Sequence, residues 1–192
     1  MPSKIQGPIL EVAIELFASH GYAGVGIRDI AAAANVTAGS IFRLFENKDS
    51  LFEEALQAAV CRCLAPEEFG KLLKADNDDF SASVQHALRR WYSSLSPQTA
   101  RLLMHASLSD NSHWRELASA RTAEVAAILA RSIRRKIRAS RMPGVDALAA
   151  SRTLILALFS LRSTHSLLHS GEKEREAVEK MIHQWIHGLS FA

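Results

Sequence analysis

Residues 27–51 read IRDIAAAANVTAGSIFRLFENKDSL, and this segment carries the clearest structural pattern in the chain. Apolar residues at helical spacing predict two short helices, at about 27–34 and 38–44, on either side of the turn Asn35-Val36-Thr37. The Thr37 hydroxyl can accept a hydrogen bond from the amide of Ser40 and so cap the second helix. We therefore expect a helix, a tight turn and a second helix, in that order.

The sequence on both sides extends this pattern to a three-helix unit. Downstream, Asn47 is a suitable cap for a helix that reaches about Leu64. Upstream, apolar residues on one face predict a helix that ends at Gly21. A longer helix before two short ones forms a unit whose second short helix can enter the major groove of DNA. The upstream apolar residues are Ile9, Val12, Ala13, Leu16 and Phe17.

The candidate DNA contacts lie on and beside the second short helix. Small residues there would let the backbone approach the duplex closely, and Arg43 is a long cation on the same helix. Lys48 falls in the first turn of the next helix, where lysine opposes the helix dipole, so a phosphate contact explains it better. The predicted DNA-binding set is Arg28, Thr37, Ala38, Gly39, Ser40, Phe42, Arg43 and Lys48.

The distribution of charge matters more than the net charge of +3. Residues 1–60 hold four basic side chains against seven acidic ones, so DNA binding there must depend on where the charges lie. Residues 121–141 hold seven basic side chains and one acidic residue, Glu124. The run 131–141 is typical of a solvated helix end, and a second nucleic-acid surface is the alternative.

Residues 9–51 resemble the DNA-binding domain of the TetR family of regulators. The resemblance implies a transcriptional regulator, expected to be a repressor that binds double-stranded operator DNA as a homodimer and is released by an unknown small-molecule effector. The matching residues are Ile9-Leu10, Ala13, Leu16-Phe17, His20-Gly21-Tyr22, Ile27, Asp29-Ile30-Ala31, Ala34-Asn35-Val36-Thr37, Gly39-Ser40-Ile41-Phe42, Phe45, Lys48 and Leu51.

Three positions depart from the family pattern. The family usually has a tyrosine where this chain has Phe42, and the tyrosine hydroxyl commonly reaches a phosphate. Leu44 stands where histidine or tyrosine is common, and Gly26 replaces the usual threonine. Phosphate contacts are then expected to depend on Thr37, Arg43, Lys48 and backbone amides.

The remainder of the chain is also helical in pattern, which predicts an all-α protein of about nine helices. Pro, Gly, Asn and Asp are frequent over 66–79, so we predict a break and a domain boundary there. The expected domains are a helix-turn-helix domain at 1–50 and a larger effector-binding and dimerisation domain at 65–192, linked by the helix at 48–64. Helices are expected beyond the boundary at about 80–95, 97–108, 112–140, 145–169 and 172–189.

The resemblance also suggests where an effector and a second subunit would bind. Family members usually hold a small effector between the helices that correspond to Phe80–Ser140, and aromatic and methionine residues there are candidates, with core packing as the alternative for each. These candidates are Trp91, Met104, His105, His113 and Trp114.

Family members usually pair their last two helices across a twofold axis. The final helix here has an apolar stripe on one side, and the sequence assigns Lys173, Glu174, Glu176, Glu179 and Lys180 to the other. The alternative is that the apolar stripes face only their own domain. The predicted interface residues are Leu158, Phe159, Val178, Met181, Ile182, Trp185 and Leu189.

Other classes of site find less support. Cys61 and Cys63 would point about 200° apart on a helix, which favours packing over metal or disulfide chemistry. The pairs His165/His169 and His183/His187 have a spacing that can hold a metal, but both lie near helix ends, where histidine suits the dipole. We expect no metal and no cofactor.

No nucleophile–base pairing or phosphate loop is visible, so we expect no enzyme. The alternatives to a regulator are a helical protein-interaction module and, as the weakest, an enzyme. The apolar run Leu154–Leu161 is too short for a membrane span, and residues 1–6 lack the apolar block of a signal peptide, so we expect a cytoplasmic protein with no membrane partner.

Overall fold

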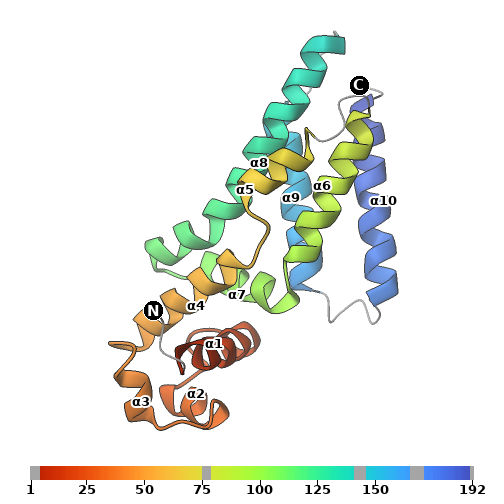
Figure 1. The fold of residues 1–192 in the computed structure, drawn as a ribbon. Coiled ribbons are helices and arrows are strands. Elements are labelled where there is room, and N and C mark those ends of the chain that lie inside the picture. Colours follow the sequence, from red (N-terminus) through yellow and green to blue (C-terminus); the bar gives the residue numbers. More distant parts are fainter. Residues whose placement is uncertain (1–4, 75–78, 141–145, 165–170, 191–192) are drawn as a thin grey trace. The chain divides into compact units, whose positions relative to one another are not determined.

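The computed structural model describes residues 5–74, 79–140, 146–164 and 171–190, without the side chains of residues 139, 140, 171, 189 and 190. This part of the chain is helical and contains no strand, so the predicted all-α class is confirmed (Figure 1). None of the described helices combines the length and the hydropathy of a membrane span. The helices are α1 (Gln6–His20), α2 (Ile27–Ala33), α3 (Ala38–Phe42), α4 (Lys48–Cys61), α5 (Pro66–Leu72), α6 (Phe80–Ser94), α7 (Pro97–Ser107), α8 (Ser112–Ser140), α9 (Ala147–Ser163) and α10 (Gly171–Ser190).

Helix α5 is one more than the sequence predicted, and it lies in the segment interpreted as a break. Ala65 is extended and Pro66 occupies the first turn, where a missing N–H costs nothing and the fixed φ suits a helix. Glu67 and Glu68 follow in the positive end of the helix dipole. Phe69 is fully buried and fixes the helix on the core, so proline here starts a helix and does not end one.

The described residues cluster in two compact units. Unit 1 comprises Met1–Arg62 and Gln98–Ser119, and within it α1 packs along α4 while α2 bridges α1 and α3. The Trp114 ring lies 4.7 Å from the Tyr22 ring and 4.5 Å from the Phe52 ring, measured between centroids. The segment 98–119 therefore packs with the N-terminal helices, although the sequence grouped it with the C-terminal domain. Local composition can indicate where a domain boundary lies, but it cannot show that a later segment packs back on an earlier domain.

Unit 2 comprises Cys63–Pro97 and Ala120–Ala192. In it α5 packs on α6, and α6, α9 and α10 contact one another. Its core is made of fully buried aliphatic and aromatic side chains, among them Phe69, Leu88, Leu129, Leu158 and Ile182.

A buried polar network ties three of these helices together. The Arg162 Nη1 lies 2.9 Å from the Glu174 Oε1, and the Arg162 Nε donates to the Leu95 carbonyl at 2.6 Å. The Tyr92 hydroxyl donates to Glu174 as well. Burial raises the pKa of Tyr92, while Arg162 opposes that rise, so the phenol stays a neutral donor.

The placement of Glu174 on the solvent side of the final helix was wrong. Only 2% of Glu174 is exposed. Glu174 lies one turn before Val178 and two turns before Ile182, on the same helix face, so the helical period alone indicates burial. A charged residue is expected at the surface unless it has a buried partner. The partner of Glu174 is Arg162 on another helix, and local sequence does not reveal this pairing.

Candidate nucleic-acid interface

The α2–turn–α3 segment has the local geometry that its sequence predicts. The Gly26 amide donates to Asp29 Oδ2 at 2.7 Å, and the Asp29 amide donates to the Gly26 carbonyl at 3.1 Å, so these two residues fix the start of α2. Asn35 adopts a φ of 54°, a left-handed conformation that asparagine tolerates better than most residues. Buried Ile30 and Ile41 hold α2 and α3 together from the inside. The turn therefore fixes the direction of α3 with few residues.

Thr37 caps α3 as expected. The Ser40 amide donates to Thr37 Oγ1 at 3.1 Å, and the two hydroxyl oxygens lie 2.9 Å apart. The Arg43 Nη2 donates to Ser40 Oγ at 3.3 Å, which links the cation directly after α3 to the cap. A side chain on Gly39 would meet only Thr37 Oγ1, at 3.8 Å, so this backbone is open to close approach.

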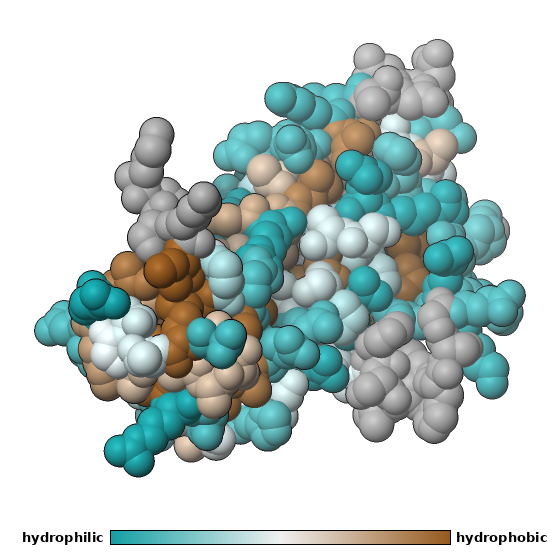
Figure 2. All heavy atoms as spheres, turned by 60° about the horizontal axis from the view of Figure 1, so that its bottom comes forward, coloured by the Kyte–Doolittle hydropathy of each residue, from teal (hydrophilic) through white to brown (hydrophobic). Residues whose placement is uncertain are grey.

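Phe42 is the last residue of α3 and is 55% exposed. Figure 2 brings this end of the molecule forward and shows hydrophobic surface (brown) on unit 1. Arg28 and Arg43 are exposed on the same unit, while Ala38 and Ser40 are partly covered. The predicted contact residues thus form an accessible surface of small, hydroxyl-bearing, aromatic and cationic side chains.

Lys48 is held in place by a residue that the DNA-binding set missed. Its Nζ lies 4.1 Å from the centroid of the Tyr22 ring, a cation–π contact. The Tyr22 hydroxyl donates to Asp49, the next residue of α4. Both contacts restrict where the Lys48 ammonium can lie. The sequence analysis predicted a phosphate contact for Lys48 and no contact within the protein. Tyr22 directly follows Gly21, where the sequence predicts the end of a helix. Its contact with Lys48 is visible only in the folded structure.

Tyr22 belongs to an aromatic cluster in unit 1. Its ring lies 5.2 Å from Phe52 and 6.2 Å from Phe17, and the Trp114 Nε1 donates to Glu53 Oε1 at 3.1 Å beside it. Burial, together with the hydrogen bond to Asp49 and its negative charge, raises the pKa of Tyr22 to about 12. The phenol is therefore protonated near neutral pH and serves as a fixed donor and ring support.

The five effector-pocket candidates do not share one unit. Trp91 is buried in α6 of unit 2, while Met104, His105, His113 and Trp114 belong to unit 1. Trp114 is buried against Tyr22 and Phe52, in the packing role that was the alternative. The effector pocket itself stays a prediction.

Most of the predicted interface residues already pack within their own unit. Leu158, Phe159, Val178 and Ile182 are buried, whereas Met181 and Trp185 are partly exposed. The Trp185 Nε1 donates to the Ala150 carbonyl at 3.2 Å, and the Leu189 side chain lies outside the description. Leu156, which the sequence analysis did not select, is 59% exposed on α9. The dimer interface stays a prediction, with Leu156 as an added candidate.

The cysteine and histidine pairs can also be placed in part. Cys61 is exposed and Cys63 is buried, and they form no disulfide with each other. The Nε2 atoms of His183 and His187 lie 3.0 Å apart on the exposed side of α10, while His165 and His169 lie outside the described residues.

Residues 9–55 match the family model described as bacterial regulatory proteins, tetR family. By this match, the N-terminal segment of the chain is similar to the DNA-binding part of the TetR family of regulators. The matched segment covers α1 to α3 and the first half of α4, which is where the predicted DNA-binding set lies.

Curated relatives resemble this chain over a limited length. The probable acrEF/envCD operon repressor of Escherichia coli (strain K12) is 43% identical over 74 residues, which are 38% of this chain and 34% of that protein. The HTH-type transcriptional repressor KstR2 of Rhodococcus jostii (strain RHA1) is 39% identical over 49 residues, 26% of this chain and 24% of that protein. The match thus spans about a third or less of these relatives' own length.

Solved structures extend the likeness to the whole fold. NalD, described as the secondary repressor of the MexAB-OprM multidrug efflux pump in Pseudomonas aeruginosa, has a TM-score of 0.66 at 25% identity, over 96% of this chain and 95% of that one. The reduced form of Escherichia coli NemR has a TM-score of 0.66 at 16% identity, over 92% and 94% of the two chains. The helical fold that this chain shares with these two structures therefore continues beyond the matched segment.

Proposed function

We propose that this chain is a transcriptional repressor that binds operator DNA as a homodimer and leaves it when a small effector binds. The observation that carries the proposal is the capped α2–turn–α3 unit with an exposed, cationic and hydroxyl-bearing surface, inside the segment that matches the TetR family. The relatives that share this segment include proteins named as repressors, which supports repression over activation.

In the proposed complex, α3 enters the major groove. The short side chains of Ala38, Gly39 and Ser40 would allow the backbone close to the base edges, and Phe42 would meet the groove with its apolar ring. Arg28 and Arg43 would neutralise phosphates beside the groove. The hydroxyls of Thr37 and Ser40 can donate to phosphate oxygens, because each carries a rotatable hydrogen.

Lys48 is the proposed phosphate anchor. Tyr22 and Asp49 restrict where its ammonium can lie, so less conformational entropy is lost when a phosphate binds. Because Tyr22 also packs on Trp114 at the start of α8, the position of this anchor depends on the first turns of α8.

Release by an effector requires two states of the dimer with different spacings of the recognition helices. A twofold dimer reads two half-sites about 34–36 Å apart, or a multiple of that distance. An effector lowers DNA affinity only if it binds the wrongly spaced state more tightly. We propose residues 65–192 as the part that binds the effector and joins the subunits, and residues 1–50 as the part that binds DNA.

Selection of bound sequences from random duplex DNA by the purified chain tests the function directly. The expected result is a palindromic or near-palindromic site whose half-sites are related by a twofold axis. Failure to enrich any sequence, with the protein folded, would contradict the proposal.

Lys48→Ala provides the residue-level test. The variant should bind operator and unrelated duplexes more weakly by a similar factor, and the slope of log affinity against log salt should fall by about one. Lys180→Ala is the matched control, because Lys180 pairs only with Glu176 on the exposed face of α10. Unchanged affinity of Lys48→Ala at every salt concentration would show that Lys48 is not a phosphate anchor.

A further inference from the structure

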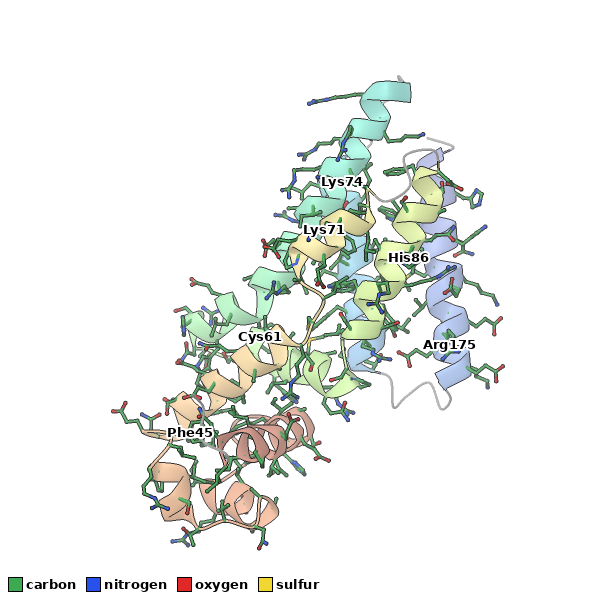
Figure 3. The ribbon with its side chains drawn as sticks, in the orientation of Figure 1. Phe45, Cys61, Lys71, Lys74, His86 and Arg175 are labelled. Carbon is green, nitrogen blue, oxygen red and sulfur yellow. The ribbon has the colours of Figure 1, made fainter. Side chains whose placement is uncertain are left out.

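A basic groove lies between α5 and α8 within unit 2. Its cavity volume is about 940 Å³. Figure 3 labels Lys71 and Lys74 on α5, on the wall that neighbours α8. The facing wall is formed by the second half of α8, which contributes Arg131, Arg134, Arg135 and Arg138.

The arginine spacing places all four guanidinium groups along one face of α8. Positions 131, 134, 135 and 138 follow the three-and-four-residue repeat, and seven residues of helix extend about 10 Å. The groove therefore carries a line of arginines on one wall and two lysines on the other. These six cations, which we call the groove cations, are all exposed.

The groove is poorly neutralised by the protein itself. Among the described residues, Glu67 and Glu124 are the carboxylates that line it, and Asp146 interacts with Arg134 from outside the lining, against six groove cations. Within the described ranges, no ion pair joins any groove cation to a carboxylate; the recorded pairs involve other residues. Several like charges in one concavity raise the local potential and attract anions.

The size of the groove restricts the anion. Pockets for small molecules have volumes of roughly 300–1,000 Å³, and this groove falls in that range. Its floor includes Ile128 and the Gly70 backbone, which are close enough that a Cβ on Gly70 would meet the Ile128 Cγ2 at 3.6 Å. A duplex presents its phosphates on a convex surface, along the edges of grooves about 6 to 12 Å wide. It would touch the rims of such a groove, whereas a small ligand can contact both walls.

We propose that the groove between α5 and α8 binds a small molecule that carries several phosphate groups. Guanidinium groups match phosphate oxygens in a two-point geometry, and lysine binds them as a compact charge. A chain of two or three phosphates extends over several ångströms and can contact successive arginines of α8. The proposal does not depend on DNA binding by unit 1, and each can fail without the other.

Calorimetric titration of the full chain with inorganic triphosphate, at low salt and without divalent cations, tests the site. The wild-type chain should bind one triphosphate per subunit, and added salt should weaken the binding. Arg131→Gln/Arg135→Gln should lose at least about tenfold in affinity, since each substitution removes a charged hydrogen-bond donor. Arg90→Gln/Arg175→Gln is the matched control, with two exposed arginines of unit 2 outside the groove, and should bind as the wild type.

A loss of affinity could also come from misfolding of the variant, so a substitution that should increase affinity is a more specific test. Glu124→Gln deletes a negative charge from the groove and should tighten triphosphate binding by about two- to fivefold. Equal losses in the groove variant and in the matched control would overturn the proposal, as would unchanged binding in Glu124→Gln.

Titration of the same variants with an unrelated DNA duplex tests the alternative that the groove binds the phosphates of nucleic acid. The groove variant should keep its affinity for the duplex. Loss of duplex binding by this variant, together with no saturable binding of triphosphate by the wild type, would make the groove a nucleic-acid surface and the proposal wrong.

Discussion

Phe42 shows most clearly how a single residue on α3 departs from the family pattern. The Phe42 ring is 55% exposed at the end of a short helix, so folding buries only part of its apolar surface. The stability of unit 1 therefore depends weakly on this side chain, and its effect should appear in DNA binding.

Phe42→Tyr should be tolerated and should bind operator DNA as tightly as the wild type or more tightly. The added hydroxyl would reach solvent in the free protein and could donate to a phosphate in the complex, where a charged hydrogen bond contributes at most about 1.5–3 kcal/mol. Fluorescence anisotropy with a labelled operator measures the change. A folded Phe42→Tyr chain that no longer binds would show that the complex closes tightly around the ring.

Tyr22 offers a residue-scale test of the support under Lys48. Its pKa is raised to about 12, so the neutral phenol favours the folded state: this contribution is complete below pH 10 and is lost as the pH rises from 10 towards 12. Asp49→Asn should lower the Tyr22 pKa towards 10 without restoring it fully, because burial is the larger cause.

Absorbance near 295 nm follows this titration, and the chain has only two tyrosines. Tyr22→Phe leaves Tyr92 alone and identifies its contribution. An unchanged Tyr22 titration in Asp49→Asn would show that the carboxylate does not act on the phenol.

At the scale of elements, α3 is only five residues long and cannot be stable by itself. It depends on the Thr37 cap and on buried Ile41. Thr37→Val keeps the shape and removes the acceptor, which should reduce the free energy of unfolding by about 1 kcal/mol. Urea denaturation measures this, and Thr37→Ser, which keeps the hydroxyl, should stay close to the wild type. Equal stability of Thr37→Val and the wild type would mean that the cap contributes nothing.

Elements whose cause is local could be predicted from the sequence. The caps by Thr37 and Asn47 and the helix end at Gly21 depend on residues within four positions, and the structure has all three. Helix α5 was missed because Pro66 was interpreted as a helix breaker. Its place at the first turn depends on Phe69 reaching a core that local sequence does not show.

The candidate site followed the same division. Its surface residues follow from one short segment, but the support of Lys48 joins Tyr22 in the loop after α1 with Asp49 in α4 and Trp114 in α8. Side chains brought together from 26 to 92 positions apart cannot be paired by helical spacing. A family resemblance confined to the first quarter of the chain could not supply Trp114 either.

At the scale of the whole molecule, the proposed dimer can be tested through Leu156. This side chain is 59% exposed on α9, so a charge there should disturb a subunit contact without unfolding unit 2. Leu156→Glu should give helical monomers that bind operator weakly, because one half-site alone gives little affinity. Trp185→Ala is less clean, since Trp185 also donates a hydrogen bond within its own unit.

Analytical ultracentrifugation decides between monomer and dimer. Leu108→Glu is the matched control, with an apolar side chain that is 77% exposed in unit 1, and should leave the oligomeric state unchanged. A Leu156→Glu chain that sediments as a tight dimer would exclude this part of α9 from the interface.

The buried group formed by Arg162, Glu174 and Tyr92 also limits how this sequence can evolve. Removing Arg162 or Glu174 alone leaves an unpaired charge in the interior, whereas replacing the ion pair by two apolar side chains of similar volume is often neutral or stabilising. Lineages must therefore pass through an unfavourable single mutant or acquire both changes together. Descendants of this chain should keep Arg162 and Glu174 as a pair or have lost both, so the two positions should change together in related sequences.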